Sequence, residues 1–221
     1  TNNALPPDGV TTTVDAQTTL HRFDNGLLLV HRRTTANDIV GVSLLSRPGS
    51  VADPEGKSGR ASLMARLLTK GTKTRTSDEI ASAVEGLGAR LSASADHDYV
   101  SLSLQCVRDD FARSVGILAD VTRHPSFPLA EIDTERKRVL ADIRMKDDRP
   151  PSATMKRLRR ELFDPHPYAR PLDGDPADIA TLTQLDLATA HAEHFRPDLI
   201  VVGVVGDLPF EAVRATLGAG F

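Results

Sequence analysis

Residues 49–72, "GSVADPEGKSGRASLMARLLTKGT", contain the pattern that decides the fold of this chain. A glycine-rich turn precedes apolar residues at helical spacing, and Lys70-Gly71-Thr72 ends the run. Apolar residues three and four positions apart share one face of a helix. The pattern predicts a helix over about 57–70. The strand "DIVGVSLLSR" comes before it and is closed by Pro48-Gly49.

The residues that precede this strand predict a hairpin and a leader. The strands "TLHRF" and "LLLVHRR" flank Asp24-Asn25-Gly26, and an Asn-Gly pair favours the positive φ values of a tight primed turn. Residues 1–18 are polar and contain two prolines, so we expect a leader or linker there.

The residues that follow the central helix predict a second helix, another hairpin and then mainly helices. The second helix begins near Ser77, whose hydroxyl can cap it. "ARLSASAD" and "DYVSLSLQCV" alternate apolar and polar residues, as an antiparallel pair does. "DLIVVGVVG" is a late buried strand that we expect to rejoin the early sheet. The remaining helices are predicted at about 108–122, 129–147, 152–163, 184–195 and 209–217, with Pro150-Pro151 separating the second from the third.

The order of these elements predicts an α+β fold. Strands come in blocks separated by blocks of helices, which favours a largely antiparallel or mixed sheet with helices packed on one side. No Ser/Gly linker and no break in composition divides the chain. We therefore expect one domain over residues 19–221.

Composition and charge exclude several classes of function. The 221 residues are 40% hydrophobic and carry a formal net charge of −3, which gives no overall attraction to nucleic acid or an anionic membrane. No run approaches the roughly 18 apolar residues of a membrane span. The one cysteine, Cys106, lies in a strand pattern and is interpreted as a buried, inert thiol.

Six segments in order resemble the pitrilysin/insulinase family of zinc peptidases, which includes mitochondrial processing peptidase. They cover the chain from about residue 19 to its end and are "LHRFDNGLLLV", "RPGSVADPEGKSGRAS", "KGTKTRTSDEIASAVEGLGARLSAS", "HPSFPLAEIDTERKRVLADI", "DPHPYARPLDGDPADIATLTQLDL" and "FRPDLIVVGVVGD". Each segment alone is weak, but their order and spacing are specific. The resemblance implies a pitrilysin-like peptidase domain, one of two or four in a full assembly.

The chemistry of that family rests on a helical His-x-x-Glu-His motif. Two histidines four residues apart share a helical face and can bind one zinc ion, while the glutamate takes a proton from the zinc-bound water. Alignment on Gly59 and Lys70-Gly71-Thr72 places Ser62 and Arg66 at the histidine positions and Ala65 at the glutamate position. The third ligand position falls on Asp142.

These replacements predict a site that neither binds zinc nor cleaves peptides. Ser62 is a poor zinc ligand, Ala65 cannot accept a proton, and Arg66 stays charged and repels a divalent cation. Asp142 is a better ion-pair partner for Arg66 than a lone metal ligand. Arg66 is also a candidate contact for acidic groups or a peptide C-terminus. The resemblance implies no cofactor in this chain and zinc in the active partner half.

Two other patterns have simpler interpretations. In "HAEH", His191 and His194 can share a helical face, but no third ligand follows, so a solvated or capping role in the last helical turn is favoured over metal binding. The ten Lys and Arg residues between positions 136 and 160 are interrupted by aspartates and lack stacking aromatics. A solvated, salt-bridged helix face explains them better than nucleic-acid binding.

The resemblance therefore implies a non-catalytic domain of a zinc peptidase assembly. Such a domain forms chamber wall and a docking surface for a homologous active half, in the same polypeptide or a separate subunit, and helps to bind peptide substrate. The main alternative is a structural, core-type subunit of a larger complex. A less favoured alternative is an active zinc peptidase that uses another site, for instance around His191 and His194.

Overall fold

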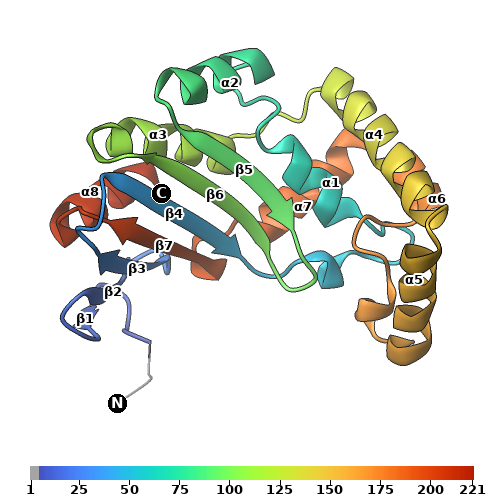
Figure 1. Cartoon of the computed structure of the whole chain (residues 1–221), viewed down its shortest axis with the longest axis horizontal. Helices are drawn as coiled ribbons and strands as arrows, with labels where there is room; N and C mark the ends of the chain where they lie inside the picture. Colours follow the sequence, from blue (N-terminus) through green and yellow to red (C-terminus); the bar gives the residue numbers. More distant parts are fainter. Residues whose placement is uncertain (1–4) are drawn as a thin grey trace.

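A mixed sheet of seven strands forms one layer of the protein (Figure 1). The computed structural model describes residues 5–221. The strand order is β1-β2-β3-β7-β4-β6-β5. Within residues 5–221 only the pairing of β3 with β7 is parallel. The late strand β7 rejoins the early sheet as predicted, and it lies between β3 and β4. The strands are β1 (Thr11–Thr13), β2 (Thr18–Arg22), β3 (Leu28–Arg33), β4 (Ile39–Ser46), β5 (Arg90–Ala95), β6 (Val100–Val107) and β7 (Ile200–Gly206).

Eight α-helices accompany the sheet in the described residues. Helices α1, α2, α3 and α8 pack against its strands, whereas α4 packs on α1, and α5 and α6 pack on α4. The α4–α6 group therefore lies beyond α1, at one end of the molecule (Figure 1). The helices are α1 (Arg60–Leu67), α2 (Ser77–Gly86), α3 (Phe111–Arg123), α4 (Leu129–Asp147), α5 (Pro150–Phe163), α6 (Pro176–Thr181), α7 (Gln184–His194) and α8 (Phe210–Gly220).

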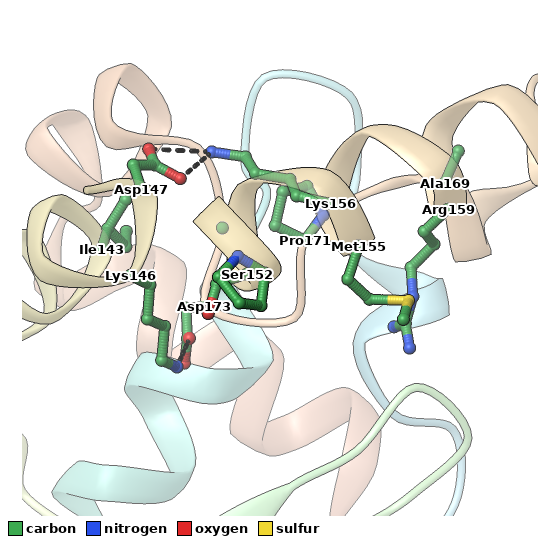
Figure 2. A pocket seen from close by; sticks show the side chains of 12 residues that line it. Ile143, Lys146, Asp147, Ser152, Met155, Lys156, Arg159, Ala169, Pro171 and Asp173 are labelled. Atoms are coloured by element: carbon green, nitrogen blue, oxygen red, sulfur yellow. Dashed lines mark hydrogen bonds and ion pairs between the residues drawn. The ribbon is translucent and has the colours of Figure 1, made fainter. Parts of the chain in front are cut away.

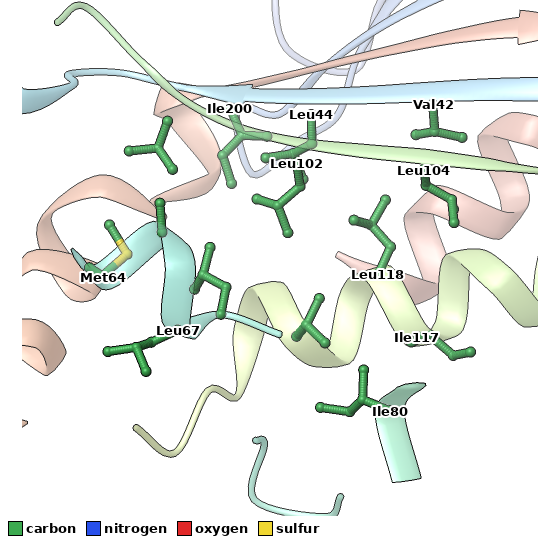
Figure 3. Close-up of a cluster of buried hydrophobic side chains, with 14 of the residues drawn as sticks. Val42, Leu44, Met64, Leu67, Ile80, Leu102, Leu104, Ile117, Leu118 and Ile200 are labelled. Carbon is green, nitrogen blue, oxygen red and sulfur yellow. The ribbon is translucent and has the colours of Figure 1, made fainter. Parts of the chain in front are cut away.

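The core lies between the helices and one face of the sheet. Successive side chains of a strand point to opposite faces, and in β4 the residues Val40, Val42 and Leu44 are buried while Gly41 and Ser43 face the other way. Figure 3 shows the inner face of the sheet above α1 and α3. The labelled core residues are Val42, Leu44, Met64, Leu67, Ile80, Leu102, Leu104, Ile117, Leu118 and Ile200.

The N-terminal part of the chain differs from the prediction in two places. Residues 11–13, assigned to a leader, form the edge strand β1 and pair with β2. The Asn25-Gly26 turn is not the predicted primed turn, because only Gly26 has a positive φ (92°). Asn25 is held by its side chain, which accepts a hydrogen bond from the Leu27 N–H and donates one to the Phe221 carbonyl.

The helices also differ from the prediction in several details. Helix α1 spans Arg60–Leu67 rather than about 57–70, and α2 begins at Ser77 as predicted but with another cap. Thr76 rather than Ser77 caps α2, in a capping box with Glu79. Pro150 and Pro151 are the first two residues of α5 rather than a break before it. Proline fits there because the N–H groups of the first helical turn have no partner within the helix, so the N–H that proline lacks is not missed. Helix α6 was not predicted, because its six residues are too short for a periodic signal. Helix α4 spans 129–147 as predicted.

Candidate functional site

Helix α1 begins at a turn that a buried carboxylate fixes. Asp53 accepts hydrogen bonds from the N–H groups of Gly59 and Ala61, both at 3.0 Å. Gly59 has φ +86° and lies against Asp173 and Gly174, so that a Cβ there would approach the Asp173 carbonyl oxygen to 2.7 Å. The turn therefore holds the start of α1 against the 171–175 loop. It also fixes the place of Ser62, Ala65 and Arg66, which the alignment assigns to the zinc motif.

A buried ion network ties the same turn to α7. Arg60 is only 4% exposed, and its Nη2 donates to Glu193 Oε2 at 2.6 Å. Arg60 Nε lies 3.7 Å from Asp53 Oδ1. Burial raises the pKa of Asp53, and this effect outweighs the opposing hydrogen bonds from Ala61 and Gly59 and the charge of Arg60. Arg60 Nε has no hydrogen-bond partner in the described chain, so the network satisfies this buried guanidinium only in part.

The three motif positions of α1 have different environments. Ser62 is buried, Ala65 is fully buried in the core, and Arg66 is half-buried. Arg66 Nη1 lies 3.8 Å from Asp142 Oδ2, which α4 supplies. The ion pair expected from the sequence is therefore present. That these residues occupy former zinc-ligand positions stays a prediction from the alignment.

Asp173 is a partner of Arg66 that sequence reasoning missed. Its Oδ1 lies 3.7 Å from Arg66 Nη2, and its Oδ2 accepts from Lys146 Nζ at the end of α4. Asp142, Arg66, Asp173 and Lys146 thus alternate in charge along one path. Asp173 lies in the "PLDGDP" loop, far from Arg66 in sequence, and no spacing rule connects them.

The groups gathered here do not fit a zinc ion. Zinc sites use three or four ligands drawn from cysteine, histidine and carboxylate. Here two carboxylates come together, and a permanently charged guanidinium lies between them. In residues 5–221, no group of three or more His, Cys, Asp or Glu side chains is placed to hold a metal ion.

His191 and His194 have separate structural roles. His191 Nε2 lies 2.7 Å from the Thr122 carbonyl oxygen, and burial lowers the pKa of this imidazole. His194 is fully buried, with Nδ1 2.7 Å from the Ala190 carbonyl oxygen. Each ring therefore contacts a different carbonyl group. The contact of His194 with a carbonyl of the last turn agrees with the predicted capping role, whereas the predicted solvated role is wrong for His194, which is fully buried.

Part of the basic cluster is salt-bridged, as predicted. Four of its cations pair with carboxylates, in the pairs Arg136–Asp133, Arg138–Glu135, Lys146–Asp173 and Lys156–Asp147. The described residues place no carboxylate within ion-pair distance of Arg157, Arg159 or Arg160 on α5. Lys137, Arg144 and Arg149 also have no such partner in the described residues, so three of the six cations without an ion pair lie on α5. No helix of residues 5–221 is long and apolar enough to cross a membrane.

Two hollows flank these elements. The first, about 460 Å³, lies between the end of α4, α5 and residues 169–174, and it shares Lys146 and Asp173 with the charge path (Figure 2). The second, about 490 Å³, lies on the outer face of the sheet. Its lining is mostly small or polar and includes Gly41, Ser43, Ser92, Ser103, Gln105 and Gly203.

Comparison with known proteins gives relatives about twice as long as this chain. An uncharacterised zinc protease of Mycobacterium leprae is 28% identical over 196 residues, which are 89% of this chain and 44% of the relative. One from Mycobacterium tuberculosis is 26% identical over 216 residues, 98% of this chain and 49% of the relative. Mitochondrial cytochrome b-c1 complex subunit 1 of Caenorhabditis elegans is 30% identical over 172 residues, 78% of this chain and 36% of that subunit.

Solved structures share the fold. A peptidase M16 inactive domain from Pseudomonas fluorescens has a TM-score of 0.88 at 24% identity, covering 92% of this chain and 50% of that one. A protease from Helicobacter pylori has a TM-score of 0.87 at 24% identity, covering 93% and 50%. The model of the insulinase family, peptidase family M16, matches residues 28–175. Since this match spans well over half of the sequence, the chain belongs to the insulinase family of peptidases, family M16.

Proposed function

We propose that this chain is a non-catalytic domain of a zinc peptidase assembly. It forms part of the chamber wall, docks on a homologous half that carries the zinc, and helps to bind peptide substrate. The observation that carries the proposal is the position of the Arg66 guanidinium between Asp142 and Asp173. The alignment predicts that Arg66 corresponds to a metal ligand of the family. A fixed cation there opposes zinc and leaves the motif helix as a wall element.

The outer face of the sheet is the proposed docking surface. No helix of the described chain packs on this face, and the small side chains Gly41, Ser43, Ser103 and Gly203 leave a hollow across three neighbouring strands. Small residues allow another element to approach a sheet closely. Because the mycobacterial relatives are about twice as long, the proposed occupant is a second, homologous half.

The free edge of β5 is the proposed contact for peptide substrate. Among the described strands, β5 is the last of the sheet and pairs only with β6, so one side of its backbone has N–H and C=O groups available. Helix α1 packs against the same strand. An extended peptide that adds to this edge would lie beside the helix that carries Arg66.

The assembly proposal is tested by mixing this chain with a zinc-bearing homologous half. We expect no cleavage of an unstructured peptide by this chain alone, and a rise of about tenfold or more when it is added to the active half. Gly41→Arg should abolish the rise, because it fills the outer hollow. The backbone at Gly41 leaves room for a side chain, with no atom within 4 Å of an added Cβ.

Gly116→Arg is the matched control. Gly116 is exposed on α3, on the opposite layer, and also has no atom within 4 Å of an added Cβ. It should leave the rise unchanged. Equal effects of both variants would remove the docking surface from the proposal. Stoichiometric zinc in this chain, lost on Asp142→Ala, would overturn the non-catalytic assignment itself.

A structural, core-type subunit is the second candidate. The similarity to cytochrome b-c1 complex subunit 1 of Caenorhabditis elegans and of Bos taurus favours it. This function predicts stable incorporation into a larger complex, with no change in the cleavage rate of any active half. Purification of the tagged chain, followed by peptidase assay of the complex, separates the two candidates.

A further inference from the structure

The cavity between α4, α5 and residues 169–174 lies next to the Arg66 charge path but is not explained by it. We propose that this cavity binds the C-terminal end of a peptide, with the last side chain in the apolar part and the terminal carboxylate on Arg159. The inference deepens the proposed function, because it names the part of a peptide that this chain recognises.

The cavity has an apolar lining that suits a hydrophobic side chain. Ile143 comes from α4, Pro151 and Met155 come from the first two turns of α5, and Pro171 comes from the loop. Met155 is 57% exposed, and its flexible thioether can adapt to ligands of different shape. The volume of about 460 Å³ lies within the usual range of roughly 300–1,000 Å³ for ligand pockets.

The charges around the cavity leave one cation without a carboxylate. Lys146 pairs with Asp173, and Lys156 lies 3.0 Å from Asp147 Oδ1; both pairs are drawn as dashed lines in Figure 2. Arg159 is the third cation of the lining. In residues 5–221 its one hydrogen bond is made by Nη1 to the ring nitrogen Nε2 of His97, at 2.5 Å.

The contact with His97 orients Arg159 without neutralising it. The pKa of His97 is lowered, mainly by burial and then by the charge of Arg159, so the imidazole is the neutral acceptor near pH 7. The remaining N–H groups of the guanidinium have no acceptor in the described chain. A planar guanidinium binds a carboxylate through two parallel hydrogen bonds, which is the geometry that a peptide terminus offers.

A C-terminal residue suits this arrangement better than an internal acidic residue. Its carboxylate and its side chain leave the same Cα, so one residue can fill the apolar part and reach the cation. The side chain of an internal Asp or Glu ends in the carboxylate itself and leaves the apolar lining empty. A fatty acid has the same chemistry, and competition distinguishes it from a peptide.

The test measures binding of an N-terminally fluorescein-labelled hexapeptide of glycine and serine that ends in leucine. Fluorescence anisotropy is recorded with the 221-residue chain. We expect the free acid to bind at least about tenfold more tightly than the C-terminal amide, since hydrogen bonds to charged groups are strong. A peptide that ends in serine should also bind more weakly than the one ending in leucine. Octanoate is the competitor that tests the fatty-acid source. If octanoate displaces the peptide and binds far more tightly than the peptide does, peptide recognition is overturned.

Arg159→Gln should weaken binding of the acid about tenfold and leave the amide unchanged. Arg157→Gln is the matched control, because Arg157 lies on the same helix, is exposed and does not line the cavity. Arg159→Lys keeps the charge and should retain part of the affinity. Equal binding of acid and amide by the unmodified chain would overturn the inference. Because the assay needs no partner, acid-specific binding without any effect on an active half would instead contradict the proposed function.

Discussion

Arg66 decides the chemistry at the residue scale. It places a fixed positive charge on α1, at a position that the alignment predicts to be a former zinc ligand, and Asp142 and Asp173 lie within ion-pair distance of that charge. Each pair is partly exposed, so each contributes at most about 1 kcal/mol to stability. The arrangement matters less for stability than for excluding a second cation from the same place. Ala65 occupies the position that the alignment assigns to the general base, the motif glutamate. Its side chain is fully buried in the core and has no group that could accept a proton.

Rebuilding the motif by Ser62→His, Ala65→Glu and Arg66→His should create at best weak zinc binding. Asp142 is one methylene shorter than the glutamate of the family, and ligand distances must hold within roughly 0.2 Å. The new glutamate would also be placed at a fully buried position, and we expect a loss of about 3 kcal/mol in the free energy of unfolding.

Zinc titration against a competing chelator and urea unfolding measure the two effects. Adding Asp142→Glu to the triple variant should tighten zinc binding about tenfold or more. Full peptidase activity from the triple change alone would show that the decay of the site has been overestimated.

The start of α1 is decided at the scale of the element. Gly56 and Gly59 both have positive φ, at 74° and 86°, within the same turn. They differ in their surroundings, because an added Cβ meets nothing within 4 Å at Gly56 but lies 2.8 Å from Gly174 Cα at Gly59. The turn geometry and the contact with the 171–175 loop can therefore be separated by two similar substitutions.

Gly56→Ala should lower the free energy of unfolding by about 1 kcal/mol, the cost of a left-handed backbone with a side chain. Gly59→Ala should cost about 3 kcal/mol or more, because backbone atoms of the loop must also move. Urea unfolding of both variants measures the difference. Equal losses would mean that the close approach of the turn to the 171–175 loop adds nothing to stability.

At the scale of the whole molecule, four histidines make the fold sensitive to acid. The pKa values of His21, His31, His97 and His191 are all lowered, in each case mainly by burial. Unfolding returns each group to a pKa near 6.5, so below that pH the unfolded chain binds more protons than the folded one. Stability is therefore full above about pH 6.5 and falls as the pH drops toward the lower folded values.

Urea unfolding at pH 7.5 and pH 5.5 should show a lower free energy of unfolding at the acidic pH. Each histidine contributes at most about 1.4 kcal/mol per pH unit. His191→Gln should reduce the difference, because an amide can still donate to the Thr122 carbonyl but does not titrate. An equal or larger difference in this variant would contradict the assignment. The comparison also cancels the opposite effect of Asp53, whose pKa is raised.

Local patterns in the sequence were enough for most elements, because they are set by near neighbours. Helix α4, the β5–β6 hairpin and the late strand β7 were all predicted from periodicity. Some failures were local, such as the short helix α6 and the Thr76 cap of α2, and others involved distant residues. Asn25, for example, bonds to Phe221 at the other end of the chain, and the expected primed turn does not form.

For the candidate site too, some features follow from local sequence and others from contacts between distant segments. The sequence by itself determined the family and the α+β fold, and it predicted the loss of the zinc-binding residue types, because these depend on the order and chemistry of residues in short segments. Only the tertiary structure decided that Asp173 completes the charge path, that Arg159 lines a cavity without a carboxylate partner, and that one face of the sheet is open. Each of these depends on contacts between segments far apart in sequence, which the packing of α1, α4, α5 and the 171–175 loop brings together.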